Sequence, residues 1–266
     1  MARVADKRKS KPRRAPPKEA RPPKGKSGAR AKSSGARKRP SLLWRLLRWP
    51  VRLILAAAIL TVLWVVSYRV IDPPGGIYMA SESLRLDGIK RTWRSMDQIS
   101  PRLARSVMAG EDARFCEHYG FDFDAIRAAL AANEAGGQTF GASTLTQQVA
   151  KNVFLWHRRS WLRKGLEAGF TVLIELTWSK RRILEVYLNT AEFAEGVFGA
   201  EAAAQHHFGR AAIALTPRQA ARLAAVLPSP KKRNARKPSR RVQRRAARIA
   251  DGAATLAASG RADCIK

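Results

Sequence analysis

The segment from Leu53 to Tyr68 holds 16 residues without a charge. As a helix it would extend about 24 Å at roughly 1.5 Å per residue, slightly less than a hydrocarbon core of about 30 Å. Arg52 and Arg69 flank it, and such side chains can reach toward lipid headgroups. We predict a single transmembrane helix over residues 46–70. A buried core helix is the alternative, because its composition would be similar.

Basic residues are concentrated at the two ends of the chain. The net charge is +31, and residues 1–52 hold 19 Lys and Arg against 2 acids, while residues 231–266 hold 12 against 2. The stretch between them carries only +4, so we expect no folded nucleic-acid-binding domain. We predict a disordered basic arm over 1–45, a folded domain over 71–230 and a basic C-terminal tail over 231–266.

The arginine-rich arm also predicts the orientation of the anchor. Lys and Arg close to a membrane span favour the cytoplasmic side. The arm is too long and too charged for a cleavable signal sequence. The N-terminus is therefore expected in the cytoplasm, and the domain after residue 70 outside it.

The exported domain is predicted to be mainly α-helical. Apolar residues recur at helical spacing in most of its segments, whereas alternating β-branched runs are few. The best candidate for short extended structure is residues 76–88. Cys116 and Cys264 neither establish nor exclude a disulfide, and the spacing of Cys and His gives no structural metal site.

One candidate for chemistry is the acidic pair in "GEDARFCEHYGFD". Glu111 is followed by Phe115, and an apolar wall raises the pKa of a carboxyl toward the working pH of a general base. The alternative is that Glu111 and Asp112 only favour the start of a helix.

A second candidate is "GASTLTQQVAKN", which has many neutral polar groups, one cation and no acid. Ser143 would cap a helix on which Gln148 and Lys151 share a face. Hydroxyls and amides suit sugars, and a single cation suits a phosphate. A polar surface helix is the alternative.

The third candidate is "RKGLE". Arg163 and Lys164 lie four and three residues before Glu167, so an acid would stand between two cations on one helix face. The cations could hold a diphosphate leaving group. A surface ion pair is the simpler explanation, and it would contribute less than about 1 kcal/mol.

These segments, with "KRRILEVYLN" and "EAAAQHHFG…LAAVLPSP", closely resemble glycosyltransferase family 51, the peptidoglycan glycosyltransferases. The resemblance covers residues 80–230 and is strongest to the monofunctional biosynthetic transglycosylases of Gram-negative bacteria, which have no transpeptidase domain. It implies a lysozyme-like α fold. It also implies polymerisation of lipid II into β-1,4 glycan strands, with inversion at the donor MurNAc C1 and release of undecaprenyl diphosphate.

The resemblance also assigns roles to residues of this chain. Glu111 would be the general base and Glu167 the second essential acid, near the leaving group and a divalent cation, Mg or Mn; no nucleotide is implied. Substrate contacts would come from these residues: Asp112, Ser143, Thr144, Gln147, Gln148, Lys151, Asn152, Arg163 and Lys164.

The implied location is the bacterial inner membrane, with the catalytic domain in the periplasm. The implied partners are lipid II, the growing glycan strand and other cell-wall synthesis or divisome proteins. Two other functions stay open from the residues alone. One is a membrane-bound muramidase or lytic transglycosylase, and the other is a basic adaptor for nucleic acid or anionic lipid.

Overall fold

The computed structural model describes residues 42–134, 143–158 and 160–266. Most of the predicted arm over 1–45 lies outside these residues. By its internal contacts the chain forms two units, Met1–Arg48 and Trp49–Lys266. The second unit contains every candidate site residue.

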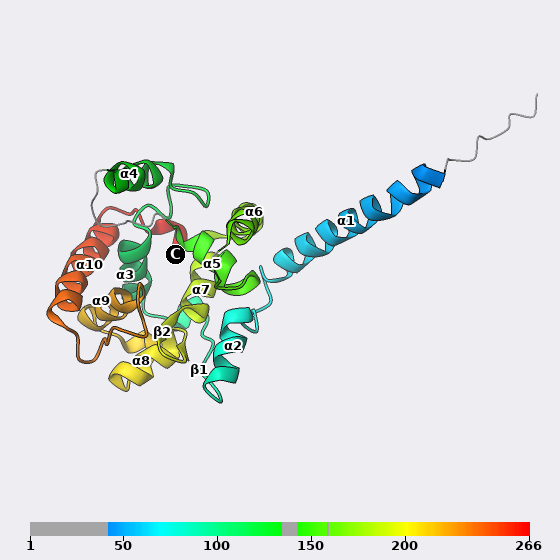
Figure 1. The fold of residues 1–266 in the computed structure, drawn as a ribbon. Helices are drawn as coiled ribbons and strands as arrows, with labels where there is room; N and C mark the ends of the chain where they lie inside the picture. Colours follow the sequence, from blue (N-terminus) through cyan, green and yellow to red (C-terminus); the bar gives the residue numbers. More distant parts are fainter. Residues whose placement is uncertain (1–41, 135–142, 159) are drawn as a thin grey trace, which may run out of the picture. The chain divides into compact units, whose positions relative to one another are not determined.

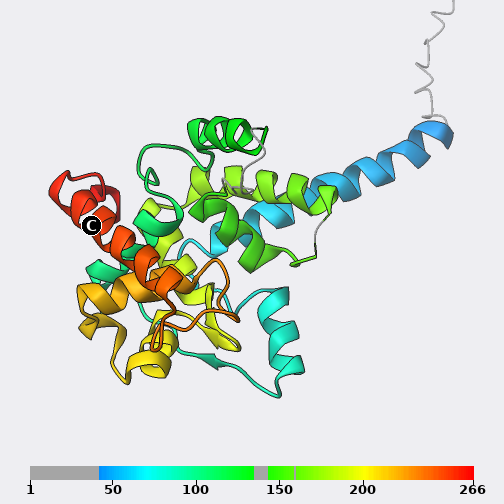
Figure 2. The ribbon, with the colours of Figure 1, turned by 60° about the vertical axis from the view of Figure 1, so that its left-hand side comes forward.

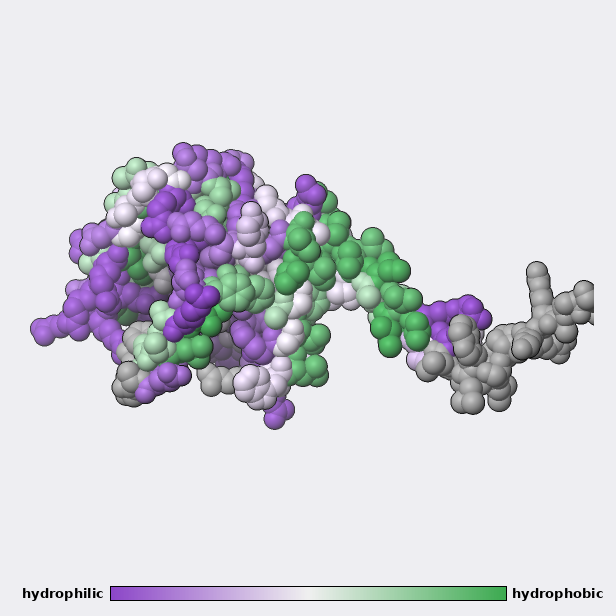
Figure 3. Space-filling view, turned by 90° about the horizontal axis from the view of Figure 1, so that it is seen from above, coloured by the Kyte–Doolittle hydropathy of each residue, from purple (hydrophilic) through white to green (hydrophobic). Residues whose placement is uncertain are grey.

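The apolar helix α1 runs from Leu42 to Ser67, so it begins four residues before the predicted span. Its Arg48–Ser67 part has a mean hydropathy of 2.1 and only 6% of its most apolar window is buried, so by length and composition it could cross a membrane. Figure 3 shows apolar surface along this helix. The helix is held at its C-terminal end, where the Trp178 indole donates to the Val65 carbonyl over 2.9 Å.

The rest of the second unit is mainly helical, which confirms the predicted fold class (Figure 1). Short 3-10 turns η1 (Met96–Gln98), η2 (Ala212–Ala214) and η3 (Asp263–Ile265) accompany the helices. The helices after α1 are α2 (Ile77–Arg85), α3 (Pro101–Glu111), α4 (Phe123–Glu134), α5 (Leu145–Phe154), α6 (Trp161–Thr177), α7 (Lys180–Thr190), α8 (Ala200–Phe208), α9 (Pro217–Val226) and α10 (Arg240–Ala258).

A small sheet joins β1 (Lys90–Arg91), β2 (Glu192–Ala194) and β3 (Val197–Phe198) in the order β1-β3-β2. β1 pairs with β3 in parallel, and β2 pairs with β3 antiparallel. The prediction of extended structure over 76–88 was wrong, because most of that segment is helix α2. Its buried residues Met79 and Glu82 are three apart, which is the spacing of one helix face.

The prediction that residues 231–266 form a basic tail also needs correction. Residues 240–258 form α10, which packs against α3 and α9 (Figure 2). The arginine count hid an apolar stripe whose members recur every three or four residues. The buried members of that stripe are Val242, Ala246, Ile249, Ala253 and Leu256.

A disulfide settles the question that the two cysteines left open. Cys116 and Cys264 are bonded across 148 residues, with Cα atoms 5.7 Å apart. The bond ties the end of the chain, beyond α10, to the loop that follows α3. The C-terminal segment is therefore fixed to the domain both by packing and covalently.

Candidate active site

Glu111 is the last residue of α3, and its side chain is 12% exposed. Its Oε2 accepts from Gln148 Nε2 over 3.2 Å, and its Oε1 accepts from Arg245 Nη2 over 3.2 Å. Burial raises the pKa of Glu111, and the contacts with Gln148 and Arg245 oppose this only in part. The helix-start alternative is excluded, because Glu111 ends a helix. The Glu111 carboxyl is therefore held by two hydrogen bonds, and it binds a proton more tightly than an exposed carboxyl does.

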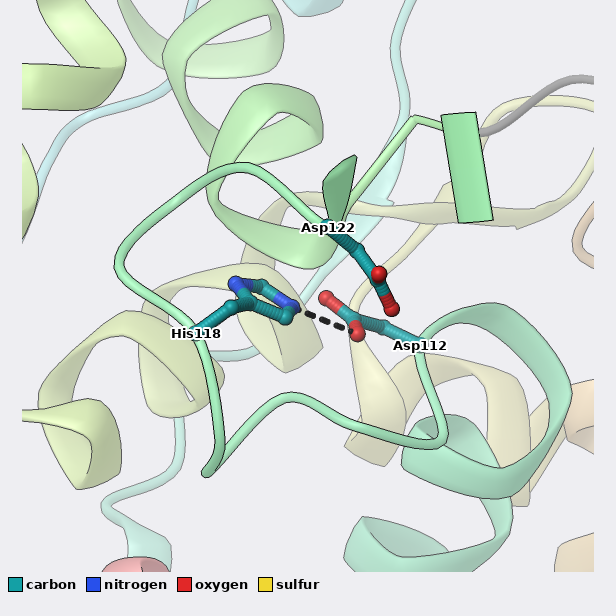
Figure 4. Close-up of side chains that lie close together, drawn as sticks. All are labelled: Asp112, His118 and Asp122. Atoms are coloured by element: carbon teal, nitrogen blue, oxygen red, sulfur yellow. Dashed lines mark hydrogen bonds and ion pairs between the residues drawn. The ribbon is translucent and has the colours of Figure 1, made fainter. Parts of the chain in front are cut away.

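Asp112 is the C-cap of α3 and belongs to a buried hydrogen-bond network (Figure 4). Its Oδ1 lies 2.9 Å from His118 Nε2, and its Oδ2 accepts from the Leu145 backbone N–H over 3.0 Å. The second bond satisfies one of the free N–H groups at the start of α5. Because both oxygens have protein partners, the geometry favours a structural role for Asp112 over the predicted substrate contact.

Asp112, His118 and Asp122 are a buried group that could hold a metal ion, since one ligand atom from each lies within 4.8 Å of the others (Figure 4). Two carboxylates and an imidazole suit a divalent cation. His118 would then exchange its hydrogen bond with Asp112 for the metal. The group includes neither Glu111 nor Glu167, the residue beside which the sequence predicted a cation.

The start of α5 is closed by a capping box. Thr144, not Ser143, is the N-cap; its side chain accepts from the Gln147 N–H, and the Gln147 side chain accepts from the Thr144 N–H. Thr144 Oγ1 also donates to the Gly120 carbonyl over 2.6 Å. Both capping side chains are buried, whereas Ser143 is exposed. Thr144 and Gln147 therefore hold the helix in place, and Ser143 remains accessible.

Gln148 connects Glu111 to the core. Its Nε2 donates to Glu111, while its Oε1 accepts from the Tyr187 hydroxyl over 3.2 Å. Tyr187 is 1% exposed, so it cannot rotate freely toward solvent. Because the Tyr187 hydroxyl binds the Gln148 amide oxygen, the amide nitrogen is oriented to donate to the Glu111 carboxylate.

Lys151 lies one turn after Gln148 on α5 and interacts electrostatically with both Glu111 and Glu167. Burial lowers the pKa of its ammonium, and the negative charges of Glu167 and Glu111 act against that lowering. Asn152 is half-buried, and its carbonyl stands so close to Gly76 that a Cβ there would lie 1.8 Å from it. The start of α2 therefore packs closely against the C-terminal turn of α5.

Glu167 lies on α6 between the two cations that the sequence predicted. Its Oε2 accepts from Arg163 Nη1, and its Oε1 accepts from Lys164 Nζ over 2.5 Å. The Glu167 side chain is 4% exposed and that of Arg163 12%, whereas Lys164 is 43% exposed. This is more enclosed than the surface ion pair offered as the alternative. A divalent cation at Glu167 would share the carboxylate oxygens with these two side chains.

The sequence from residue 79 to residue 254 matches the family model described as Transglycosylase. The chain belongs to the transglycosylase family. Similar proteins named "Biosynthetic peptidoglycan transglycosylase" occur in Jannaschia sp., with 58% identity over 82% of this chain and 90% of the relative, and in Rhodospirillum centenum, with 51% identity over 85% and 98%. A relative with the same name in Caulobacter vibrioides is 51% identical over 76% of this chain and 88% of the relative.

The transglycosylase match includes every predicted site residue and continues through most of α10. It therefore extends beyond the boundary at residue 230 that the sequence motifs suggested. Two residues at the site were missed by sequence reasoning. Arg245 could have been noticed from the apolar periodicity of α10, which predicts a packed helix; Tyr187 carries no local signal that separates it from a core residue.

Proposed function

We propose that this protein polymerises lipid II into β-1,4-linked glycan strands. Membership of the transglycosylase family makes it a peptidoglycan glycosyltransferase, with relatives named for that synthesis. The observation that supports the residue assignment best is the arrangement around α5. Gln148 binds Glu111, and Lys151, on the same helix face, interacts electrostatically with both Glu111 and Glu167.

In the proposed reaction Glu111 is the general base. The Glu111 carboxylate takes the proton from the acceptor GlcNAc 4-hydroxyl as that oxygen attacks the donor MurNAc C1. The bond from C1 to the diphosphate oxygen breaks, and undecaprenyl diphosphate leaves with the electron pair. Attack from the opposite face inverts the configuration. A buried carboxyl suits this step, because burial raises its pKa toward the working pH.

The second half of the site would hold the leaving group. Arg163, Lys164 and Lys151 supply positive charge for a diphosphate, and charge-assisted hydrogen bonds of this kind are strong. Glu167 would keep the first two cations in position, since it binds both. Ser143 and Asn152 are proposed as further contacts to the sugars; for Asp112, Thr144 and Gln147 the buried contacts favour a structural role.

The steps above are assigned to side chains of this chain. Each oxygen of Glu167 already binds a cationic side chain. If a divalent cation takes part, Asp112, His118 and Asp122 offer the ligands. Such a cation would bind Asp112, the residue that follows the proposed base Glu111, and would add positive charge there.

We propose that the protein works at the inner membrane, anchored by α1, with its N-terminus cytoplasmic and its catalytic domain in the periplasm. A lipid-linked donor requires an enzyme at a bilayer surface, and an anchor raises the local concentration of both. α6 adds exposed apolar side chains suited to an interface: Trp161 is 93% exposed, Leu162 70% and Leu176 76%. Other cell-wall synthesis or divisome proteins are proposed as partners.

The test is to incubate the detergent-solubilised full chain with labelled lipid II. We expect long glycan polymer and release of undecaprenyl diphosphate. Cleavage of preformed sacculi with no polymer would indicate a hydrolase instead. Binding of nucleic acid or anionic vesicles with neither activity would indicate the basic adaptor.

A further inference from the structure

Arg245 reaches the proposed base from the C-terminal helix. Its Nη2 donates to the Gly110 carbonyl over 2.9 Å and to Glu111 Oε1 over 3.2 Å. Its side chain is 31% exposed, and its buried Nε has no hydrogen-bond partner within the described parts of the chain. The guanidinium thus donates to both a backbone oxygen and a side-chain oxygen in the last turn of α3.

The packing of α10 on α3 fixes where this guanidinium lies. A Cβ at Gly110 would meet the Ile249 side chain at 3.0 Å, and one at Gly252 would meet Ala109 at 3.2 Å. The two helices therefore approach closely through small residues. Beyond α10, the Cys116–Cys264 disulfide ties the same segment to the loop that follows Glu111. Arg245 is presented by a rigid element, as a group that orients another side chain requires.

The charged and titratable groups that act on or respond to Glu111 come from four parts of the fold. α5 provides one cation, α7 a phenol, the segment between α9 and α10 a second cation, and α10 a third: Lys151, Tyr187, Arg233 and Arg245. Of these, Arg245 hydrogen-bonds to the carboxylate itself. The neutral Gln148 amide binds the other oxygen from α5.

We propose that Arg245 is a positioning residue that orients the Glu111 carboxylate for proton abstraction. The proposal rests on the proposed role of Glu111 as the base. With one oxygen held by Gln148 and the other by Arg245, the carboxylate cannot rotate away without losing both bonds.

A guanidinium is suited to this position because its planar donors fix the direction of the hydrogen bonds, which a lysine ammonium does less well. It can therefore bind the Gly110 carbonyl and Glu111 Oε1 at the same time.

The experiment compares the full chain in detergent with four variants: Arg245→Gln, Arg245→Lys, Arg244→Gln and Glu111→Gln. Arg244 is an exposed neighbour on α10 and serves as the matched control. The measurements are kcat and KM for labelled lipid II at neutral pH and one ionic strength, and the thermal unfolding midpoint.

For Arg245→Gln we expect kcat at neutral pH to fall by about 10- to 100-fold with little change in the KM for lipid II. Arg245→Lys should recover part of kcat. Arg244→Gln should match the unmodified chain. A merely structural role for Arg245 would lower the unfolding midpoint and leave the kcat of the folded protein unchanged.

A kcat of Arg245→Gln equal to that of Arg244→Gln, while Glu111→Gln is inactive, would overturn this proposal and leave the proposed function standing. Turnover by Glu111→Gln would overturn both. If Arg245→Gln gives no cooperative unfolding, Arg245→Lys decides. A kcat of that variant equal to that of Arg244→Gln refutes the proposal, and a lowered kcat with an unchanged KM supports it.

Discussion

Glu111 and Glu167 are both enclosed glutamates, yet their surroundings differ in charge. Glu111 is bound by one neutral amide and one guanidinium, and burial dominates its pKa, which is raised. Glu167 has a cation on each oxygen, Arg163 on one and Lys164 on the other. The first arrangement favours uptake of a proton, and in the second the carboxylate binds two cationic side chains.

The comparison predicts different chemical roles for the same residue type. A buried carboxyl with a raised pKa suits a base, and a carboxyl bound to two cationic side chains suits a group that positions them. Substitutions at the two glutamates and their partners should either separate their roles further or show that they act alike.

The largest expected effect is that of Glu111→Gln. An amide of the same shape cannot accept the proton, so turnover should fall by about 10² to 10⁴-fold. The fold should persist, because Gln148 and Arg245 can still donate to the new carbonyl oxygen. Lipid II polymerisation and thermal unfolding of the variant measure the two effects. Near-normal polymer would place the base elsewhere.

Glu167→Gln should reduce turnover less, by about 10²-fold, because the cations stay but lose their orientation. Unlike the change at Glu111, it should also lower the free energy of unfolding by about 2 kcal/mol, since Arg163 is left enclosed without a charged partner. Urea titration of the detergent-solubilised variant measures this loss. Equal stability of the two variants would contradict the contrast between the two glutamates.

Lys164→Gln should raise the apparent KM for lipid II by about tenfold and change stability little. The lysine is 43% exposed, so solvent screens its pairing with Glu167. Initial rates over a range of lipid II concentrations give the KM. Lys180→Gln, which breaks a 3.0 Å pair with Glu175 on the same helix as Glu167, is the control. An unchanged KM would count against the diphosphate contact.

The smallest expected effect is on stability as a function of pH. Because the folded-state pKa of Glu111 is raised, the folded protein binds the proton more tightly than the unfolded chain. The contribution of Glu111 is therefore fully present below its ordinary pKa of 4.5 and is lost as pH rises through the folded-state value. A tenfold difference in proton affinity between the folded and unfolded states is one pKa unit and corresponds to about 1.4 kcal/mol of stability.

This loss appears as a difference between two pH series. Glu111→Gln should gain stability relative to the unmodified chain as pH rises above 4.5, measured by urea unfolding at several pH values. Glu167→Gln serves as the comparison series. A difference between Glu111→Gln and the unmodified chain that does not change with pH would show that burial does not control the Glu111 carboxyl.

Much of the fold and part of the site followed from the sequence. The helical periodicity predicted the mainly α fold, and the i,i+3 and i,i+4 spacing predicted that Arg163 and Lys164 meet Glu167. The motifs predicted the family and its activity, which the family match confirms. These inferences succeed because they depend on neighbours within one or two helical turns.

The predictions that needed correction depended on distant neighbours. Thr144 and Gln147 were expected to face substrate, but they form a capping box and are buried. The C-terminal arginines concealed α10, because charge counting ignores the apolar stripe on the opposite side of the helix. Whether Cys116 would find Cys264 was undecided, since 148 residues separate them.

The sequence alone determined an apolar helix near the N-terminus, a helical domain and an acid placed between two cations on one helix, because each is a property of local spacing. Tertiary structure decided which amide binds one oxygen of Glu111 and which arginine binds the other. Gln148 and Arg245 lie 37 and 134 residues from Glu111 along the chain, and only the packing of α5 and α10 against the end of α3 brings them to its two oxygens.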